Sequence, residues 1–243
     1  MNALLIIGVF CTVLPIVSAF AWKLSTGSKV IPFLSGAACF LIFAILLESP
    51  ARSFIANNAF IRSNGLLYAL CGALAAGLFE ETGRALFFHY ILKNCNDRKD
   101  AVSFGIGHGG VECLLLVGIN FIAYYMYARM IANGNGDLLD PVVVTTINAI
   151  VDSTTVSSAL ATCVERVASL ALHIALSIIV FTALRNNQLS GIPIAIALHA
   201  FVDVFAGLYQ SGVITNIWVV ELLIIIYSFC VSFYAFQKYK SLK

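Results

Sequence analysis

Long apolar stretches separated by short polar connections dominate the chain. The stretches are continuous rather than alternating, and most approach the ~20 residues that a helix needs to cross ~30 Å of hydrocarbon. A helix also satisfies its own backbone hydrogen bonds inside a membrane. We therefore predict an all-α, polytopic membrane helix bundle with about seven transmembrane helices. The predicted spans are residues 3–22, 30–48, 66–92, 102–131, 163–184, 191–209 and 214–236.

The composition agrees with this fold class, because 60% of the 243 residues are hydrophobic and only 11% are charged. Soluble domains are about half apolar and a quarter charged. No composition shift marks a soluble domain, so we expect one integral membrane domain over residues 1–243, surrounded by the lipid bilayer and without a nucleic-acid partner. The seven cysteines are scattered and form no CxxC pair, which favours neither a disulfide framework nor a thiolate metal site.

The distribution of Lys and Arg predicts the orientation of the chain in the cell membrane. With the N-terminus outside and the C-terminus cytoplasmic, most basic side chains fall in inner loops and the C-terminal tail. The inner set is Lys23, Lys29, Lys93, Arg98, Lys99, Arg185, Lys238, Lys240 and Lys243, and the outer set is Arg52, Arg62, Arg129 and Arg166.

Residues 132–162 form the longest connection and stand outside the predicted spans. The turn-forming sequence "NGNGDLLDP" precedes an apolar run at 141–151 that is too short to cross a membrane. A packed external loop and a lid over a cavity both fit this pattern.

Polar side chains inside the predicted spans are the candidate functional residues. Near the bilayer centre each charged group costs roughly 2.5–3.5 kcal/mol, so the five formally charged residues among them oppose insertion by on the order of 12 kcal/mol. Their depths, about 9–18 Å from the predicted cytoplasmic helix ends, place them in one slab. We therefore predict a polar site in the cytoplasmic half, in a chamber that opens toward the cytoplasmic leaflet. The residues are Glu80, Glu81, Arg84, His108, Glu112, His173, His199 and Asp203.

Helical spacing predicts which of these side chains face one another. Arg84 falls between Glu80 and Glu81 on the helix surface, so it can pair with one and leave the other free. His108 with Glu112, and His199 with Asp203, are i,i+4 pairs in which a carboxylate can orient an imidazole. We interpret the remaining acids of the apolar regions as structural; they are Glu48, Asp152, Glu165 and Glu221.

Glycines surround His108 in the sequence "SFGIGHGGVE". Gly105, Gly107 and Gly110 match G-x-G-x-x-G, but no strand precedes them, which argues against nucleotide binding. Close approach of helices is the better interpretation. The glycines would also leave backbone exposed beside His108, where a substrate could dock.

Three kinds of chemistry fit such a set. A carboxylate with an imidazole can activate water, as in a hydrolase. Zn²⁺ could instead be held by imidazoles and a carboxylate gathered from separate helices, since HExxH is absent. Acids and histidines inside a membrane could also relay protons or bind ions in a coupled transporter. The candidate zinc ligands are His108, His173, His199 and Glu112.

Four of these features together resemble a known family. "FEETGR" at 79–84, "FGIGHGGVE" at 104–112, the intramembrane His173 and "HAFVD" at 199–203 are similar to the YhfC family of intramembrane (metallo)proteases. That family lies within the superfamily of CAAX-processing and bacteriocin-processing (Abi) proteases, whose pattern is EExxxR, FxxxH and HxxxN. The resemblance covers residues 66–210 and implies an intramembrane endopeptidase acting on membrane-associated or transmembrane peptides.

Carried onto this sequence, the resemblance implies that Glu80 is the water-activating base and that His108 assists it. It gives His199 and Asp203 an oxyanion-stabilising role and makes Arg84 a brace for Glu81. Two departures are visible: Arg84 comes one residue early, and Asp203 replaces an asparagine. An ionised Asp203 cannot donate to an oxyanion. The sequence leaves open a zinc or a glutamate-only mechanism, and which of the two glutamates is the base.

Overall fold

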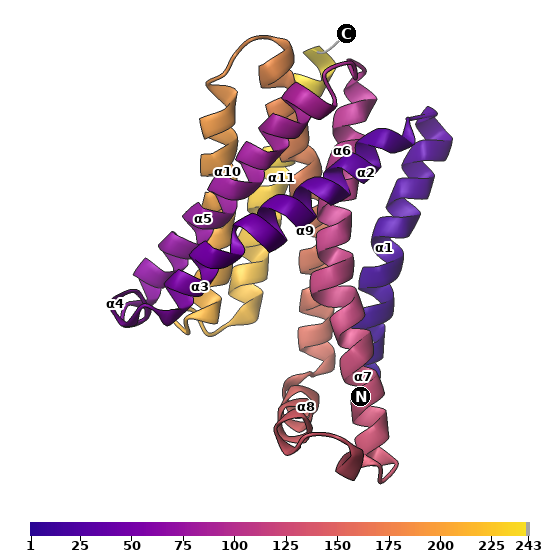
Figure 1. Ribbon diagram of the computed structural model, residues 1–243, viewed down its shortest axis with the longest axis vertical. Helices are drawn as coiled ribbons and strands as arrows, with labels where there is room; N and C mark the ends of the chain where they lie inside the picture. Colours follow the sequence, from indigo (N-terminus) through magenta and orange to yellow (C-terminus); the bar gives the residue numbers. More distant parts are fainter. Residues whose placement is uncertain (242–243) are drawn as a thin grey trace.

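The computed structural model describes residues 1–241, which form a bundle of helices (Figure 1). Lys243, one of the basic residues used to orient the chain, lies outside the described residues. In chain order, the elements are α1 (Asn2–Thr26), α2 (Val30–Phe40), η1 (Leu41–Leu47), α3 (Ser49–Asn57), α4 (Ala59–Arg62), α5 (Gly65–Leu86), η2 (Phe87–Ile91), α6 (Arg98–Glu112), η3 (Cys113–Gly118), α7 (Ile119–Ala132), η4 (Gly136–Leu138), α8 (Pro141–Ser153), α9 (Val156–Arg185), α10 (Gly191–Gln210) and α11 (Ile217–Ser241).

Local sequence signals set several helix ends. Asn64 caps α5 by accepting from Leu67 N, and Asp97 caps α6 by accepting from Lys99 N. Thr155 and Ser158 form a reciprocal capping box at the start of α9, so this helix begins seven residues before the predicted span at 163–184. The predicted connection at 132–162 is therefore largely helical, with α8 covering its apolar run.

Six helices in the described part of the chain are long and apolar enough to cross a membrane. They correspond to six of the seven predicted spans, although 30–48 extends to Asn57 and 102–131 begins at Arg98. The seventh span is present as α5 followed by η2, but this helix falls outside the six because Glu80, Glu81 and Arg84 lower its apolar character. A polytopic helix bundle is thus confirmed.

The N-terminus and the C-terminus lie at opposite ends of the bundle (Figure 1). The C-terminus shares its end with the α1–α2, α5–α6 and α9–α10 connections, whereas the N-terminus, α3, α4 and α8 lie toward the other end. Those predicted inner basic residues that the structure describes consequently gather at the C-terminal end.

Glycines allow the helices around His108 to approach closely, as predicted. An added Cβ at Gly107 would lie 2.0 Å from the carbonyl oxygen of Phe33 on α2, and one at Gly36 would lie 2.0 Å from that of Phe104 on α6. The backbone beside His108 is therefore covered by α2, and His108 is completely buried. The prediction of a docking surface at these glycines is wrong.

Three π-helical segments interrupt the long helices near the polar residues. Segment η1 ends just before Glu48, η2 follows α5, and η3 begins just after Glu112. Such widened turns are rare and occur frequently at functional sites. Here they change the facing of the residues that follow.

Candidate active site in the membrane interior

Four helices bring the predicted polar residues together. Glu80, Glu81 and Arg84 come from α5, His108 and Glu112 from α6, His173 from α9, and His199 and Asp203 from α10. Most of these side chains are buried, and each has a polar partner from the same set. His89, which the sequence left out of the cluster, is exposed and stacks edge-on against Tyr90.

Glu80 and His108 form a direct contact between α5 and α6. The Nε2 atom of His108 lies 2.9 Å from Oε2 of Glu80. Phe40 packs edge-on against the imidazole, and its other nitrogen, Nδ1, is buried without a hydrogen-bond partner. The pairing places an acid and an imidazole side by side away from bulk water.

Glu81 is held between a histidine and an arginine. Its Oε1 atom lies 2.8 Å from Nδ1 of His199 and 3.5 Å from Nη2 of Arg84. Arg84 is fully buried and also donates through Nη1 to the carbonyl oxygen of His173 at 3.1 Å. Arg84 thus pairs with Glu81 and not with Glu80, which contacts His108 instead. Helical spacing predicted that Arg84 would pair with one of the two glutamates.

His173 sits between two charged partners. Its Nδ1 atom is 3.3 Å from Nη2 of Arg84, and its Nε2 atom is 2.6 Å from Oε2 of Glu112. Because a guanidinium only donates, Nδ1 accepts and Nε2 carries the proton that faces Glu112. The predicted i,i+4 pairing of Glu112 with His108 is wrong, since both residues have partners on other helices instead.

Arg166 also belongs to this region, which the sequence did not predict. Its Nη1 atom lies 3.0 Å from Oε1 of Glu112, and its guanidinium forms a further ion pair with Glu165. The charge distribution predicts Arg166 as an outer basic residue, and Glu165 is expected from the sequence to be a structural acid. The signal that could have found them was the position of both on α9, two turns before His173.

A cavity of about 600 Å³ reaches the cluster. Its walls come mainly from α3, α5, α9 and α10, with η3 and Glu112 on one side. Asp203 lies 3.4 Å from Nε2 of His199 and is the most open carboxylate of the predicted site, with 34% of its side chain exposed. The i,i+4 pairing of His199 with Asp203 is confirmed.

The cavity leads to the end of the bundle that carries α3 and α4. Ile55, Ala56, Tyr68 and Gln210 line it, and all four lie near helix ends opposite the C-terminus. The sequence predicted a chamber opening toward the cytoplasmic leaflet, together with a cytoplasmic C-terminus, but the lining residues extend to the end opposite the C-terminus. The two expectations therefore do not hold together, because depth counting places residues along a helix but does not show on which side the helices diverge.

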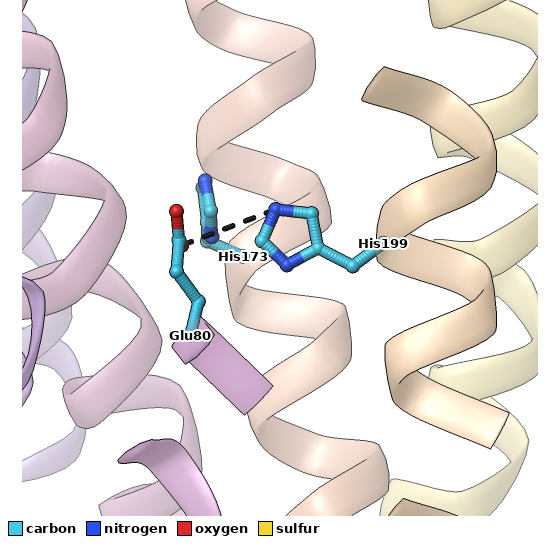
Figure 2. A group of neighbouring side chains, drawn as sticks. All are labelled: Glu80, His173 and His199. Carbon is cyan, nitrogen blue, oxygen red and sulfur yellow. Dashed lines mark ion pairs between the residues drawn. The ribbon is translucent and has the colours of Figure 1, made fainter. Parts of the chain in front are cut away.

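The donor set at the inner end of the cavity fits a divalent metal ion. Glu80, His173 and His199 each offer a ligand atom, and these atoms lie within 4.8 Å of one another. Figure 2 shows the three side chains pointing toward one another from three helices, with His199 Nε2 3.9 Å from Glu80 Oε2. Two imidazoles and a carboxylate are a donor set of catalytic zinc sites.

The surroundings of the two imidazoles also suit a metal. His199 turns Nδ1 to the carboxylate of Glu81, which is how metal-binding histidines are usually oriented, and its Nε2 lies 3.4 Å from Oδ2 of Asp203 and 3.9 Å from Oε2 of Glu80. A cation on Nε2 of His173 would take the place of the proton that faces Glu112. Of the predicted zinc ligands, His173 and His199 belong to this group, Glu80 takes the place of His108, and Glu112 lies 2.6 Å from Nε2 of His173.

Comparisons with known proteins point to one family. The model of the YhfC intramembrane metalloprotease family matches residues 10–224. The uncharacterized membrane protein YhfC of Bacillus subtilis (strain 168) is 31% identical over 228 residues, which are 89% of this chain and 88% of that protein. No solved structure matches.

Proposed function

Because this chain belongs to the YhfC intramembrane metalloprotease family, we propose that it is a metal-dependent endopeptidase that hydrolyses peptide bonds inside or beside the membrane. The observation that carries the proposal is the group Glu80, His173 and His199 at the inner end of a 600 Å³ cavity within a helix bundle. Acids and histidines inside a membrane are energetically unfavourable. A group of them that points toward one site therefore favours a functional role over a purely structural one.

We assign the metal, with Zn²⁺ as the first candidate, to Glu80, His173 and His199. When bound there, it supplies the Lewis acidity that activates water and polarises a peptide carbonyl. His108 holds the Glu80 carboxylate from α6, and Glu81 fixes the orientation of His199. These contacts restrict the ligands to one arrangement before substrate enters.

Asp203 has the contacts expected of a proton carrier. Its carboxylate is next to Nε2 of His199 and opens to the cavity, so it can take a proton from water and return one to the leaving amine. This role replaces the oxyanion donation that the resemblance implies for an asparagine, because a carboxylate accepts rather than donates.

The substrate class follows from the cavity. A volume of about 600 Å³ lies in the range of ordinary ligand pockets and admits a short extended stretch of peptide rather than a folded domain. Because the walls are transmembrane helices, we expect the peptide to come from a membrane-associated or transmembrane protein.

The test compares the metal content and peptidase activity of purified variants. Glu80→Gln, His173→Ala and His199→Ala remove one ligand each, while Glu221→Gln alters a buried acid on α11 outside the cluster and serves as the control. We expect about one zinc per chain by mass spectrometry in the wild type and the control, and loss of the metal in the three variants. Cleavage of a panel of fluorogenic apolar peptides in nanodiscs should fall by about 100-fold or more.

Other results would change the proposal. A metal-free wild type that cleaves peptides and loses activity only in Glu80→Gln would establish the glutamate mechanism instead. Ion flux in proteoliposomes without peptide cleavage would support the coupled transporter. Zinc retained by all three ligand variants would remove the proposed metal site.

A further inference from the structure

Arg166 lines the cavity and is absent from the motifs that identify the family. Its guanidinium is 3.0 Å from Glu112 and pairs on the same helix with Glu165. Only 16% of the Arg166 side chain is exposed, so this is an interior arginine and not a solvated one. Two acids and an arginine thus border the site on the side of α6 and α9.

The two imidazoles of the metal group have matching surroundings. On one side, His199 Nδ1 lies 2.8 Å from Glu81, which pairs with Arg84 at 3.5 Å. On the other side, His173 Nε2 lies 2.6 Å from Glu112, which pairs with Arg166 at 3.0 Å. The order is imidazole, carboxylate and guanidinium in both cases, but Glu81 contacts the nitrogen of His199 that faces away from the metal group, whereas Glu112 contacts the nitrogen of His173 on which a cation would lie.

A buried carboxylate holds an imidazole in place only if the carboxylate is itself held. Its free oxygens need partners, since an unpaired buried charge is strongly unfavourable. A guanidinium provides several donors in a rigid plane and fixes the carboxylate more tightly than an ammonium does. Arg84 pairs with Glu81 through Oε1, the oxygen that also contacts His199, whereas Arg166 pairs with Oε1 of Glu112, the oxygen that His173 leaves free.

We infer that Arg166 is a positioning residue of the site: it holds Glu112 against Nε2 of His173, the nitrogen on which a cation would lie, and so keeps the carboxylate and the imidazole beside the metal position. Glu165 holds Arg166 from the adjacent position of the helix. Arg166 contacts neither the substrate nor the metal in this assignment. Its effect passes through Glu112 to the imidazole.

Arg52 provides a matched control in the same cavity. It pairs with Glu48 at 3.0 Å and donates to the carbonyl oxygen of Ala44, so these contacts connect it to η1 and the residue that follows it, and not to the imidazoles. Removing Arg52 changes the charge of the cavity wall by the same amount as removing Arg166. A difference in Co²⁺ affinity between the two variants therefore reports where the arginine lies and not simply the loss of one positive charge.

The experiment titrates Co²⁺ into the apo form of the full chain and follows the visible absorption of the bound ion. We expect 10- to 100-fold weaker binding in Arg166→Met, partial recovery in Arg166→Lys, and binding within twofold of wild type in Arg52→Met. Glu165→Gln should weaken binding less than Arg166→Met. If Arg166→Met does not fold, Arg166→Lys and Glu165→Gln carry the comparison.

The inference rests on the proposed function only through the metal, and the outcomes separate the two. Wild-type Co²⁺ binding that Arg166→Met and Arg166→Lys leave unchanged overturns the positioning role while the metal site stands. If the wild type binds no Co²⁺, the metal proposal fails, and the ¹⁵N signals of His173 in labelled protein decide the inference. Signals that shift in Arg166→Met and not in Arg52→Met support positioning; signals that are the same in all three proteins overturn it.

Discussion

Arg84 illustrates how single residues carry this site. It is fully buried, pairs with Glu81 and reaches both the carbonyl oxygen and the ring of His173. One side chain therefore links α5 to α9 and indirectly to α10. A charge in this position stabilises the bundle only while its partners remain.

We predict that Arg84→Met lowers the free energy of unfolding by about 3–5 kcal/mol, because it leaves Glu81 buried without its cation. The exposed pair of Lys99 with Asp97 supplies the comparison, and Lys99→Met should change stability by about 1 kcal/mol or less. Thermal unfolding in detergent measures both. An equal decrease in the free energy of unfolding in the two variants would show that burial does not make the Arg84–Glu81 pair more important for stability than an exposed pair.

Helical spacing predicted residue pairing only where both partners share a helix. Arg84 with Glu81 and His199 with Asp203 followed from spacing of three and four residues. His108 and Glu112 have the same spacing, yet their partners are Glu80 and His173. Contacts between distant helices decide such cases, and a single sequence does not encode them in any local pattern.

At the scale of elements, glycines set the distance between α2 and α6 and so the position of His108. At Gly36 the α2 backbone lies directly against α6, and at Gly107 the α6 backbone lies directly against α2. A Cβ added at Gly36 would also lie 2.8 Å from the backbone nitrogen of His108. The sequence predicted the close approach. It gave no indication of the π-helical segments, because a widened turn leaves the hydrophobic pattern nearly unchanged.

We predict that Gly107→Ala destabilises the protein by about 1–3 kcal/mol or more, because its new methyl group meets the Phe33 backbone, which cannot turn aside. Gly72→Ala on α5 is the control, since a Cβ there has nothing within 4 Å and should gain up to about 1 kcal/mol of helix propensity. Thermal unfolding of the two variants in the same detergent checks this. A stable Gly107→Ala protein would mean that α2 does not pack on α6 as described.

At the scale of the whole molecule, the basic end and the open end of the bundle are opposite. Arg185 and the lysines of the C-terminal helix lie at one end, whereas the cavity leads to α3, α4 and the end of α10. If the basic end is cytoplasmic, as the charge distribution predicts, the cavity opens to the outside.

That orientation can be tested with single cysteines in a cysteine-free background. Gln210 lies at the cavity mouth and Lys93 in the α5–α6 connection at the other end, and both are exposed. We expect a membrane-impermeant maleimide to label Gln210→Cys in intact cells and Lys93→Cys only after permeabilisation. The reverse pattern would place the cavity mouth in the cytoplasm and contradict the predicted orientation.

X-ray absorption spectroscopy of the zinc-loaded protein identifies the ligand atoms of the metal without requiring a substrate. We expect a shell of nitrogen and oxygen that includes two imidazoles, one of which disappears in His199→Ala. A shell containing sulfur from the chain's free cysteines, or one that His199→Ala leaves intact, would contradict a metal centre built from Glu80, His173 and His199.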